Sequence, residues 1–327
     1  MGFVRNAWYA LSWSHEIGAD ILLARKVLGK PVIAWRKSSG EVVALADMCP
    51  HRFAPLSKGE KVGDGVRCVY HGLEFDGTGK CTHNYHGVAP SSAQVQSFPI
   101  REEQKLVWIW MGDVELSEKV AIPEIPFLTE EGWRIQFGTT NAKAGYELYN
   151  DNLLDLTHAT FLHGVIGGPE WKPKTRIREL DDGRIHCNYL VEEMGVLGDN
   201  EKRVQVEDNL YWTAPSTHVL SIEHTPRSAT ATPFYVISCH LLTPETERST
   251  HYFWAGAVPA GVPIPDEVLH DTLRTAFEIE DKPMLEAIQA NMGEADLWDL
   301  NPVLLPADSG AVRARRRLKA LREEERQ

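Results

Sequence analysis

The sequence predicts an α+β protein of two domains: an all-β N-terminal domain, then a domain in which a β-sheet grips a long helix. Two observations support this prediction. Short apolar stretches separated by Gly and Pro fill the first 120 residues or so, whereas long helical patterns flank several strand-like segments further on. The 327 residues are enough for two hydrophobic cores, and 43% hydrophobic with 24% charged residues is typical of a globular protein.

The N-terminal strands are predicted from apolar runs at residues 32–35, 42–45 and 106–110, each bounded by turn-forming residues. The stretch 113–126 contains Pro123 and Pro126 among scattered charges, which is typical of a linker. We therefore place the first domain at residues 1–120 and the second at residues 121–327.

In the second domain, we predict a helix over about 147–162, strands between about 176 and 257, and a long helix over about 265–292. Apolar residues recur at helical spacing in that last segment, namely Val268, Leu269, Leu273, Phe277, Leu285 and Ile288. A basic cluster at 313–319 runs into three glutamates at 323–325, which predicts a solvated C-terminal helix.

Charge and composition narrow the possible partners and locations. The net charge of −12 argues against a nucleic-acid ligand. No apolar run approaches the roughly 18–20 residues that span a bilayer, and the first residues lack an export signal, so we expect no membrane and a cytoplasmic location. Five Cys in such a chain point to metal binding rather than to disulfides.

Two short loops pair a Cys with a His: Cys49-Pro-His51 and Cys68-Val-Tyr-His71. Two thiolates and two imidazoles could hold a structural zinc ion, which commonly has a Cys₂His₂ set. They could also hold a Rieske [2Fe–2S] cluster, with Cys49 and Cys68 on one iron and His51 and His71 on the other. Zinc fingers usually pair Cys with Cys, whereas each loop here supplies one of each, so the spacing favours the Rieske cluster.

A second candidate metal site lies in the predicted helix. Asp155, His158 and His163 follow Asn152, and two imidazoles with one carboxylate form the facial triad that binds Fe(II). His158 and His163 are five residues apart, so on a regular helix they would point about 140° apart. They can share a metal only if the helix bulges, for example as a π-turn, or ends near Gly164, Gly167 and Gly168.

These motifs resemble the Rieske non-haem iron oxygenases, specifically the oxygenase components of the vanillate and dicamba O-demethylase branch. The matching stretches are 49–57, 68–76 and the Asp-x-x-His-x₄-His pattern at 155–163, with further likeness at 3–9 and 81–87. The resemblance implies a Rieske domain followed by a helix-grip (START/Bet v 1-like) catalytic domain with one mononuclear iron. Since the cluster is complete without them, Cys81, His83 and His86 are interpreted as a structural loop.

The resemblance also implies roles for the residues of the second site. By this likeness His158 and His163 bind the iron, and Asn152 lies close to it. Asp155 would form a hydrogen-bonded bridge between His158 and a Rieske histidine, His71, of a neighbouring subunit. Such a carboxylate would fix the imidazole tautomers and shorten the electron path.

In the family the third iron ligand is an acidic residue on the long C-terminal helix. Asp281 is the choice here, with Glu280 and Glu278 as alternatives. Pro283 lies inside the helical pattern and lacks an N–H, so we expect a kink just after Asp281.

For the substrate, the stretch 237–246 resembles a strand and turn where a family histidine reaches a substrate carboxylate. His240 is thus a candidate anchor for an acidic aromatic ligand, and His218 is a weaker one; an ordinary strand histidine is the alternative for both. The resemblance implies O-demethylation of a methoxy-aromatic acid with release of formaldehyde, using O₂ and external electrons. Ring or methyl hydroxylation, including dioxygenation, is the alternative within the family.

The absence of a G-x-G-x-x-G motif after a strand predicts that a separate NAD(P)H-dependent reductase, with flavin and an iron–sulfur centre, supplies the electrons. A homotrimer is expected from the family. Two other classes of protein could use part of these motifs. A Rieske electron carrier would not need the Asp155–His163 pattern, and a zinc-stabilised ligand-binding protein would be colourless.

Overall fold

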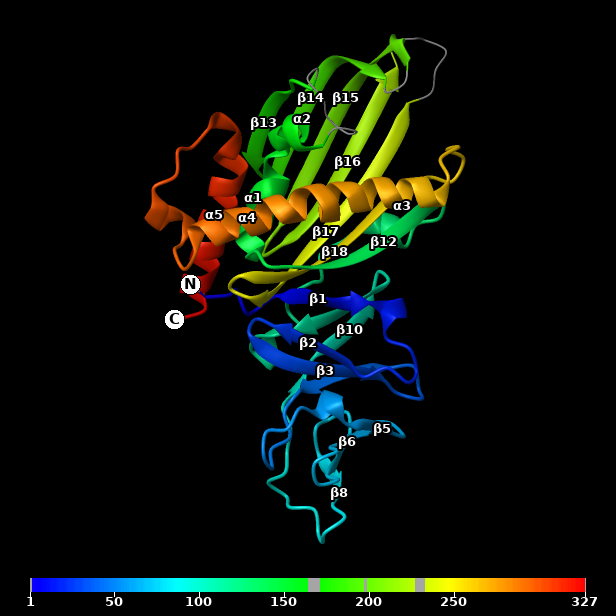
Figure 1. Cartoon of the computed structure of the whole chain (residues 1–327), viewed down its shortest axis with the longest axis vertical. Helices are drawn as coiled ribbons and strands as arrows, with labels where there is room; N and C mark the ends of the chain where they lie inside the picture. The colour runs from blue at the N-terminus through cyan, green and yellow to red at the C-terminus, as the bar shows by residue number, and fades with distance from the viewer. Residues whose placement is uncertain (1, 164–170, 197–198, 227–232, 327) are drawn as a thin grey trace. The chain divides into compact units, whose positions relative to one another are not determined.

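The computed structural model describes residues 2–163, 171–196, 199–226 and 233–326. The chain divides into two compact units (Figure 1). One contains residues 5–122 together with 243–246, and the other contains residues 1–4, 123–242 and 247–327. None of the described helices is both long enough and apolar enough to cross a bilayer.

The unit of residues 5–122 is built from β-strands in three small sheets. Their strand orders are β1-β11-β10, β2-β3-β4-β9 and β5-β6-β7-β8, and the paired strands are antiparallel. The strands are β1 (Trp8–Trp13), β2 (Leu23–Val27), β3 (Lys30–Arg36), β4 (Val42–Ala46), β5 (Glu60–Val62), β6 (Gly65–Arg67), β7 (Glu74–Phe75), β8 (Cys81–His83), β9 (Ser97–Phe98), β10 (Ile100–Glu103) and β11 (Leu106–Trp110). The short 3₁₀ turns are η1 (Ser14–Glu16), η2 (Leu56–Lys58) and η3 (Val114–Leu116). The predicted all-β class of this unit is confirmed.

The other unit contains one large antiparallel sheet, which has seven strands in the described residues. Its order is β12-β18-β17-β16-β15-β14-β13. The strands are β12 (Trp133–Ala142), β13 (Lys174–Glu179), β14 (Ile185–Val196), β15 (Asp199–Thr213), β16 (Thr217–Pro226), β17 (Phe234–Thr246) and β18 (Ser249–Pro259). Because neighbours in the order are mostly neighbours in sequence, hairpins build the sheet and place its residues in a fixed register.

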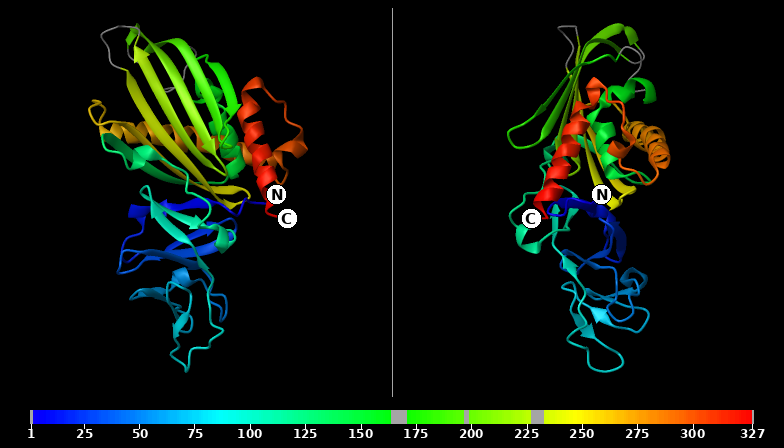
Figure 2. Two further views of the ribbon diagram at one scale, coloured as in Figure 1. Left: turned by 180° about the vertical axis from the view of Figure 1, so that it is seen from behind. Right: turned by 90° about the vertical axis from the view of Figure 1, so that its left-hand side faces the viewer.

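Helices cover one face of this sheet, as the two views of Figure 2 show. They are α1 (Tyr146–Leu154), η5 (Leu156–His158), α2 (Ala159–Leu162), α3 (Asp266–Arg274), the π-helix η6 (Thr275–Asp281), α4 (Lys282–Met292) and α5 (Ser309–Glu324), with short turns η4 (Pro126–Leu128), η7 (Leu297–Leu300) and η8 (Pro306–Asp308). The run from α3 to α4 crosses the strands, which is the helix-grip arrangement predicted above.

The predicted helix over 147–162 is interrupted. α1 ends at Leu154, and Asp155 has an extended backbone with φ −127° and ψ 92°. A 3₁₀ turn and the four-residue helix α2 follow, and α2 ends before His163. The break required for His158 and His163 to meet is therefore present. The proposed stop at Gly164, Gly167 and Gly168 lies outside the described residues.

The π-turn occurs in the other helix. Residues 275–281 form the π segment η6, and Pro283 lies in the first turn of α4. Because Pro283 has no N–H, one α-helical hydrogen bond to this turn cannot form, and a wider turn fits the missing donor. In place of the kink predicted just after Asp281, the structure has a π-helix that ends at Asp281.

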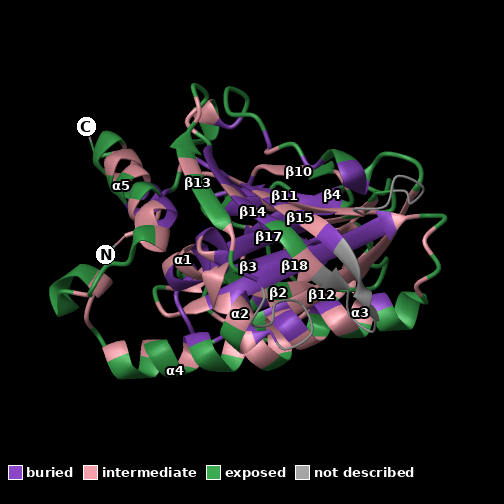
Figure 3. Cartoon of the chain, turned by 90° about the horizontal axis from the view of Figure 1, so that it is seen from above, coloured by how far each residue is buried: buried purple, intermediate pink, exposed green. Residues whose placement is uncertain are grey.

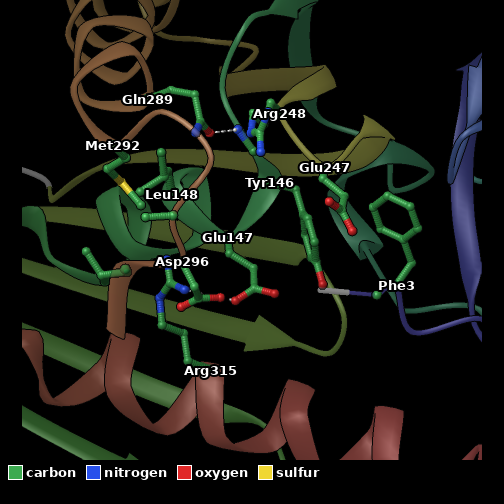
Figure 4. A pocket seen from close by; sticks show the side chains of 14 residues that line it. Phe3, Tyr146, Glu147, Leu148, Glu247, Arg248, Gln289, Met292, Asp296 and Arg315 are labelled. Atoms are coloured by element: carbon green, nitrogen blue, oxygen red, sulfur yellow. Dashed lines mark hydrogen bonds and ion pairs between the residues drawn. The ribbon is translucent and has the colours of Figure 1, made fainter. Parts of the chain in front are cut away.

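The predicted C-terminal helix is present as α5, but the prediction that it is solvated was wrong for one of its sides. Figure 3 shows α5 with a buried side, and Arg315 is only 6% exposed. Its guanidinium donates to both carboxylate oxygens of Asp151, at 2.9 and 3.0 Å, and to Glu147 at 3.0 Å. Charge spacing along α5 could not reveal these partners because they belong to α1. Figure 4 shows Arg315 and Glu147 at the wall of a small cavity of about 40 Å³.

We predict that Arg315→Ala lowers the free energy of unfolding by about 3–5 kcal/mol, because it leaves Asp151 and Glu147 without their cation between α1 and α5. Chemical denaturation monitored by circular dichroism measures the free energy of unfolding. Arg316→Ala is the matched control, since Arg316 is exposed on the same helix. Equal stability of the two variants would contradict the assignment.

Candidate metal centres and substrate face

The two loops that each pair a Cys with a His have the same backbone geometry. In each loop the Cys N–H donates to the carbonyl five residues on, and its carbonyl accepts from the N–H four residues on; the four bonds are Cys49 N–Ala54 O 2.8 Å, Phe53 N–Cys49 O 2.8 Å, Cys68 N–Leu73 O 2.9 Å and Gly72 N–Cys68 O 2.9 Å. The fourth residue after each Cys has a left-handed backbone, with φ +60° at Phe53 and +76° at Gly72. In the sequence, only Gly72 indicates a left-handed backbone, because glycine adopts it readily.

The loops bring their four metal-binding side chains together. Cys49 and Cys68 are each 2% exposed, and the rings of His51 and His71 lie 4.4 Å apart, with His51 exposed and His71 half-buried. Burial raises the pKa of the Cys49 thiol to about 11, so metal binding is what would hold a thiolate there at neutral pH. Buried sulfurs beneath a pair of imidazoles fit a cluster with one Cys-bound and one His-bound iron.

The loop at 81–87 packs over the loop that contains Cys68 and His71. The ring of Tyr85 lies so close to Gly72 that a Cβ added there would come within 2.9 Å of it. Asn84 and His86 line a hollow together with His51 and His71. Cys81 is buried, with its Sγ 3.5 Å from the carbonyl oxygen of His83. This loop therefore supports the cluster loop through Tyr85, as its interpretation as a structural loop expects.

The second site joins the α1–α2 region to the π segment. Three potential ligand atoms form a triangle: His158 Nε2 to His163 Nε2 is 3.2 Å, His158 Nε2 to Asp281 Oδ1 is 3.5 Å, and His163 Nε2 to Asp281 Oδ1 is 3.3 Å. Adjacent ligands of an octahedral ion bonded at about 2.1 Å lie about 3 Å apart. In the described part of the chain, these two histidines and one carboxylate are the one group of three His, Cys, Asp or Glu side chains whose ligand atoms all lie within 4.8 Å of one another, as a single ion requires.

Both imidazoles are held so that Nε2 faces the triangle. The Nδ1 of His158 lies 2.6 Å from the backbone carbonyl oxygen of Asp155, and the Nδ1 of His163 lies 2.8 Å from Glu280 Oε2. An acceptor at Nδ1 places the proton there and leaves a lone pair on Nε2 for a metal. Glu280, an alternative ligand in the sequence analysis, thus contacts a ligand rather than the triangle, and Glu278 contributes no atom to it.

Asn152 and Asp155 flank the triangle in different ways. The Asn152 amide nitrogen lies 3.3 Å from both His158 Nε2 and Asp281 Oδ1. The Asp155 carboxylate accepts from the backbone N–H of Thr157 at 2.9 Å and from its hydroxyl at 2.6 Å, and so caps the 3₁₀ turn that carries His158. Within the chain, Asp155 therefore reaches His158 through its backbone carbonyl.

His240 and His218 are neighbours in the sheet register, and both are buried. His240 Nδ1 lies 2.6 Å from the Tyr252 hydroxyl, and its Nε2 lies 3.0 Å from Ser238 Oγ. Burial lowers the pKa of His240 to about 4, against the opposing charge of Asp281. The ring is neutral at pH 7, so it would meet a carboxylate as a hydrogen-bond donor and not as a cation.

Aromatic side chains line the region between the sheet and the π segment. Phe277, one turn before Asp281, lies edge-on to His240 at 5.0 Å and near Tyr252 and Trp254, at 6.0 and 5.6 Å. Tyr252 in turn lies 5.2 Å from Tyr149 of α1. Such a cluster beside the triangle suits an apolar, aromatic ligand.

Comparison with known proteins assigns the chain to a family. Residues 7–99 match the Rieske [2Fe–2S] domain, and residues 142–324 match the vanillate O-demethylase oxygenase C-terminal domain. The chain is an oxygenase component of the Rieske non-haem iron oxygenases. It is 35% identical to the dicamba O-demethylase oxygenase component of Stenotrophomonas maltophilia, covering 98% of each chain. It is also 35% identical to the chloroacetanilide N-alkylformylase oxygenase component of Rhizorhabdus wittichii, covering 97% of this chain and 95% of that one.

Solved structures agree with this assignment. Dicamba monooxygenase bound to 3,6-dichlorosalicylic acid matches with a TM-score of 0.90 at 33% identity, covering 99% of each chain. A structure of the same protein with non-haem iron and dicamba matches with a TM-score of 0.85. The fold class, the membership of the O-demethylase branch and the two cofactors, a Rieske [2Fe–2S] cluster and a mononuclear iron, are thereby confirmed for this Rieske oxygenase.

We predict that Glu280→Ala weakens Fe(II) binding at the mononuclear site by about 10- to 100-fold, because His163 loses the acceptor that orients its ring. Competition with a colorimetric chelator measures the affinity. Glu280→Gln keeps an acceptor oxygen and should recover part of the loss, and Glu278→Ala on the same helix is the control. An unchanged affinity in Glu280→Ala would refute the role.

Proposed function

We propose that this Rieske oxygenase demethylates a methoxy-aromatic acid. The overall reaction is ArOCH₃ + O₂ + 2e⁻ + 2H⁺ → ArOH + HCHO + H₂O. The observation that carries the proposal is the His158–His163–Asp281 triangle beside the aromatic cluster of Phe277, Tyr252 and Trp254. The names of relatives that act on dicamba and vanillate, both O-demethylases, support it.

The residues that would hold the two groups follow from the geometry. Cys49 and Cys68 with His51 and His71 would bind the Rieske cluster; His158, His163 and Asp281 would bind the iron. When bound, the cluster supplies single electrons and the iron supplies the site for O₂ reduction.

The residues next to the iron ligands position these ligands and the substrate. Asn152 donates to Asp281 and so steadies the ligand carboxylate, while Asp155 Oδ1 holds the turn that carries His158. Neutral His240, between Ser238 and Tyr252, would donate to the substrate carboxylate once one of these hydroxyls gives way.

We further propose the partners expected from the sequence. A separate NAD(P)H-dependent reductase with flavin and an iron–sulfur centre would supply the electrons. A homotrimer would place His71 of one subunit next to Asp155 of its neighbour. His71 is half-buried and lines the hollow described above together with His51. This position leaves an edge of its ring available for such a contact.

Formaldehyde release coupled to O₂ uptake tests the reaction. The enzyme, with a surrogate reductase and NADH, is assayed against a panel of methoxy and methyl aromatic acids. We expect equal amounts of formaldehyde and phenol from a methoxy substrate. Ring diols or benzylic alcohols, with no formaldehyde from any methoxy compound, would instead support ring or methyl hydroxylation.

A further inference from the structure

The sheet face that looks toward the helices contains polar atoms without partners. Side chains alternate along a strand, so the register Trp212–His218–His240 places these three residues on one face, together with Asp208 four residues before Trp212. His240 packs against Phe277 of the π segment, so this face is the one that faces the iron-binding helices. Within the described residues, the buried atoms on it that lack a hydrogen-bond partner include Asp208 Oδ1, Trp212 Nε1 and His218 Nδ1.

The unpaired atom of His218 is a hydrogen-bond acceptor. Its Nε2 lies 2.8 Å from Asn150 Oδ1, while the amide nitrogen of Asn150 donates to the Pro215 carbonyl at 3.2 Å. The amide oxygen must therefore accept, and His218 Nε2 must carry the proton. Burial lowers the pKa of His218 far below its usual value, so the ring is neutral and Nδ1 presents a lone pair. In this tautomer the free atom of His218 would accept from a donor group of a ligand, whereas a substrate carboxylate needs a donor.

Asp208 presents a second unpaired acceptor. The residue is 4% exposed, and no group in the described ranges donates to its Oδ1. Burial raises its pKa to about 7, and a hydrogen bond from the Trp171 side chain to the carboxylate opposes this rise. The neighbouring Tyr189 cannot help, since its hydroxyl donates to Leu154 O at 2.8 Å and accepts from Leu156 N at 3.3 Å. A buried oxygen that lacks a donor destabilises the protein, and a ligand that supplies a donor would remove this cost.

The side chains around Asp208 on the sheet are only partly covered. Its partner across the register on β16, Ile222, is only half-buried, as are Leu220 and Val236 on the same face. The helices therefore do not fully cover this part of the sheet. Asp208 and His218 are separated by about four residues along the strands, or about 14 Å, so a ligand with a single aromatic ring would not contact both.

We propose that Asp208 is a specificity-determining residue that accepts a hydrogen bond from a hydroxyl or amino group of the substrate, and that the preferred substrates are methoxy-aromatics with such a donor. The inference rests on the proposed function in one respect: the substrate is an aromatic compound bound on this face. Sites built to hydrogen-bond a substrate group discriminate strongly against analogues that lack it, because the protein's polar atom is then left unpaired.

Ligand binding to the oxidised holoenzyme tests the proposal without turnover. Isothermal titration compares pairs of methoxybenzoic acids that are identical except that one bears a ring hydroxyl or amino group. The wild type should bind the protic member of at least one pair about 10- to 100-fold more tightly. Asp208→Leu should reduce that ratio to about one, and Asp208→Asn, which keeps an acceptor oxygen, should retain part of it.

Glu207→Gln is the matched control, since residue 207 points to the opposite face of β15 and contacts Asn188 there. Circular dichroism verifies that each variant is folded. If Asp208→Leu does not fold, the affinity ratios of Asp208→Asn and of the wild type decide whether Asp208 contacts the ligand. No preference for protic ligands in the wild type, or an unchanged preference in a folded Asp208 variant, overturns the inference. Formaldehyde is measured separately, so protic binding that depends on Asp208 without demethylation would sink the proposed function alone.

Discussion

His158→Ala is expected to lose the mononuclear iron and all oxygenase activity while keeping the Rieske cluster. The triangle would then retain only His163 and Asp281, and two ligands no longer form the facial set that Fe(II) needs. The cluster ligands belong to the other compact unit, so its colour should persist. Iron analysis should fall by about one equivalent per chain, from about three to about two.

His270→Ala is the control for this experiment. His270 lies on α3, next to Asp271 and outside the triangle, so its replacement should leave the iron content unchanged. Retention of all three irons by His158→Ala would show that the assigned ligand is wrong. Loss of the cluster spectrum would show that the substitution disturbs the whole chain.

Asp155→Asn is expected to slow electron transfer to the mononuclear site by about a hundredfold or more while both cofactors stay bound. The amide keeps the oxygen that accepts from Thr157, so the turn that carries His158 should survive. It loses the negative charge that the proposed bridge to His71 of a neighbouring subunit requires. Stopped-flow absorbance follows re-oxidation of the reduced cluster in the presence of O₂ and substrate.

Asp182→Asn is the control, because Asp182 lies in an exposed turn between β13 and β14. Re-oxidation at the wild-type rate in Asp155→Asn would remove the proposed bridge. Loss of cluster colour would mean that the carboxylate acts on folding and not on electron transfer.

The sequence predicted the chemistry of the two metal centres better than their supporting contacts. Cys49, His51, Cys68 and His71 are recognisable because paired loops with one Cys and one His are rare, and residue types alone indicate their ligands. The helix end between His158 and His163, at Leu162, followed from helical geometry. The π-turn, however, lies beside Asp281 and not between His158 and His163. Local spacing could not show this, because the carboxylate ligand is distant in sequence from the two histidines.

Two supporting contacts could not be predicted because each joins segments distant in sequence. Glu280 meets His163 across 117 residues, and Arg315 meets Asp151 across 164. Asp208 did leave a signal. In the stretch 204–212, Val204, Val206, Leu210 and Trp212 occupy alternate positions, and Asp208 interrupts that apolar series. A charged residue at a core position of a strand pattern indicates a functional group.

The central claim is that a paired-iron cluster in the first unit feeds a single iron in the second, and metal analysis combined with electron paramagnetic resonance tests it most directly. Protein purified without air should contain about three irons per chain and give a rhombic Rieske signal after reduction. Far fewer irons with no such signal, or zinc in place of iron, would contradict the account.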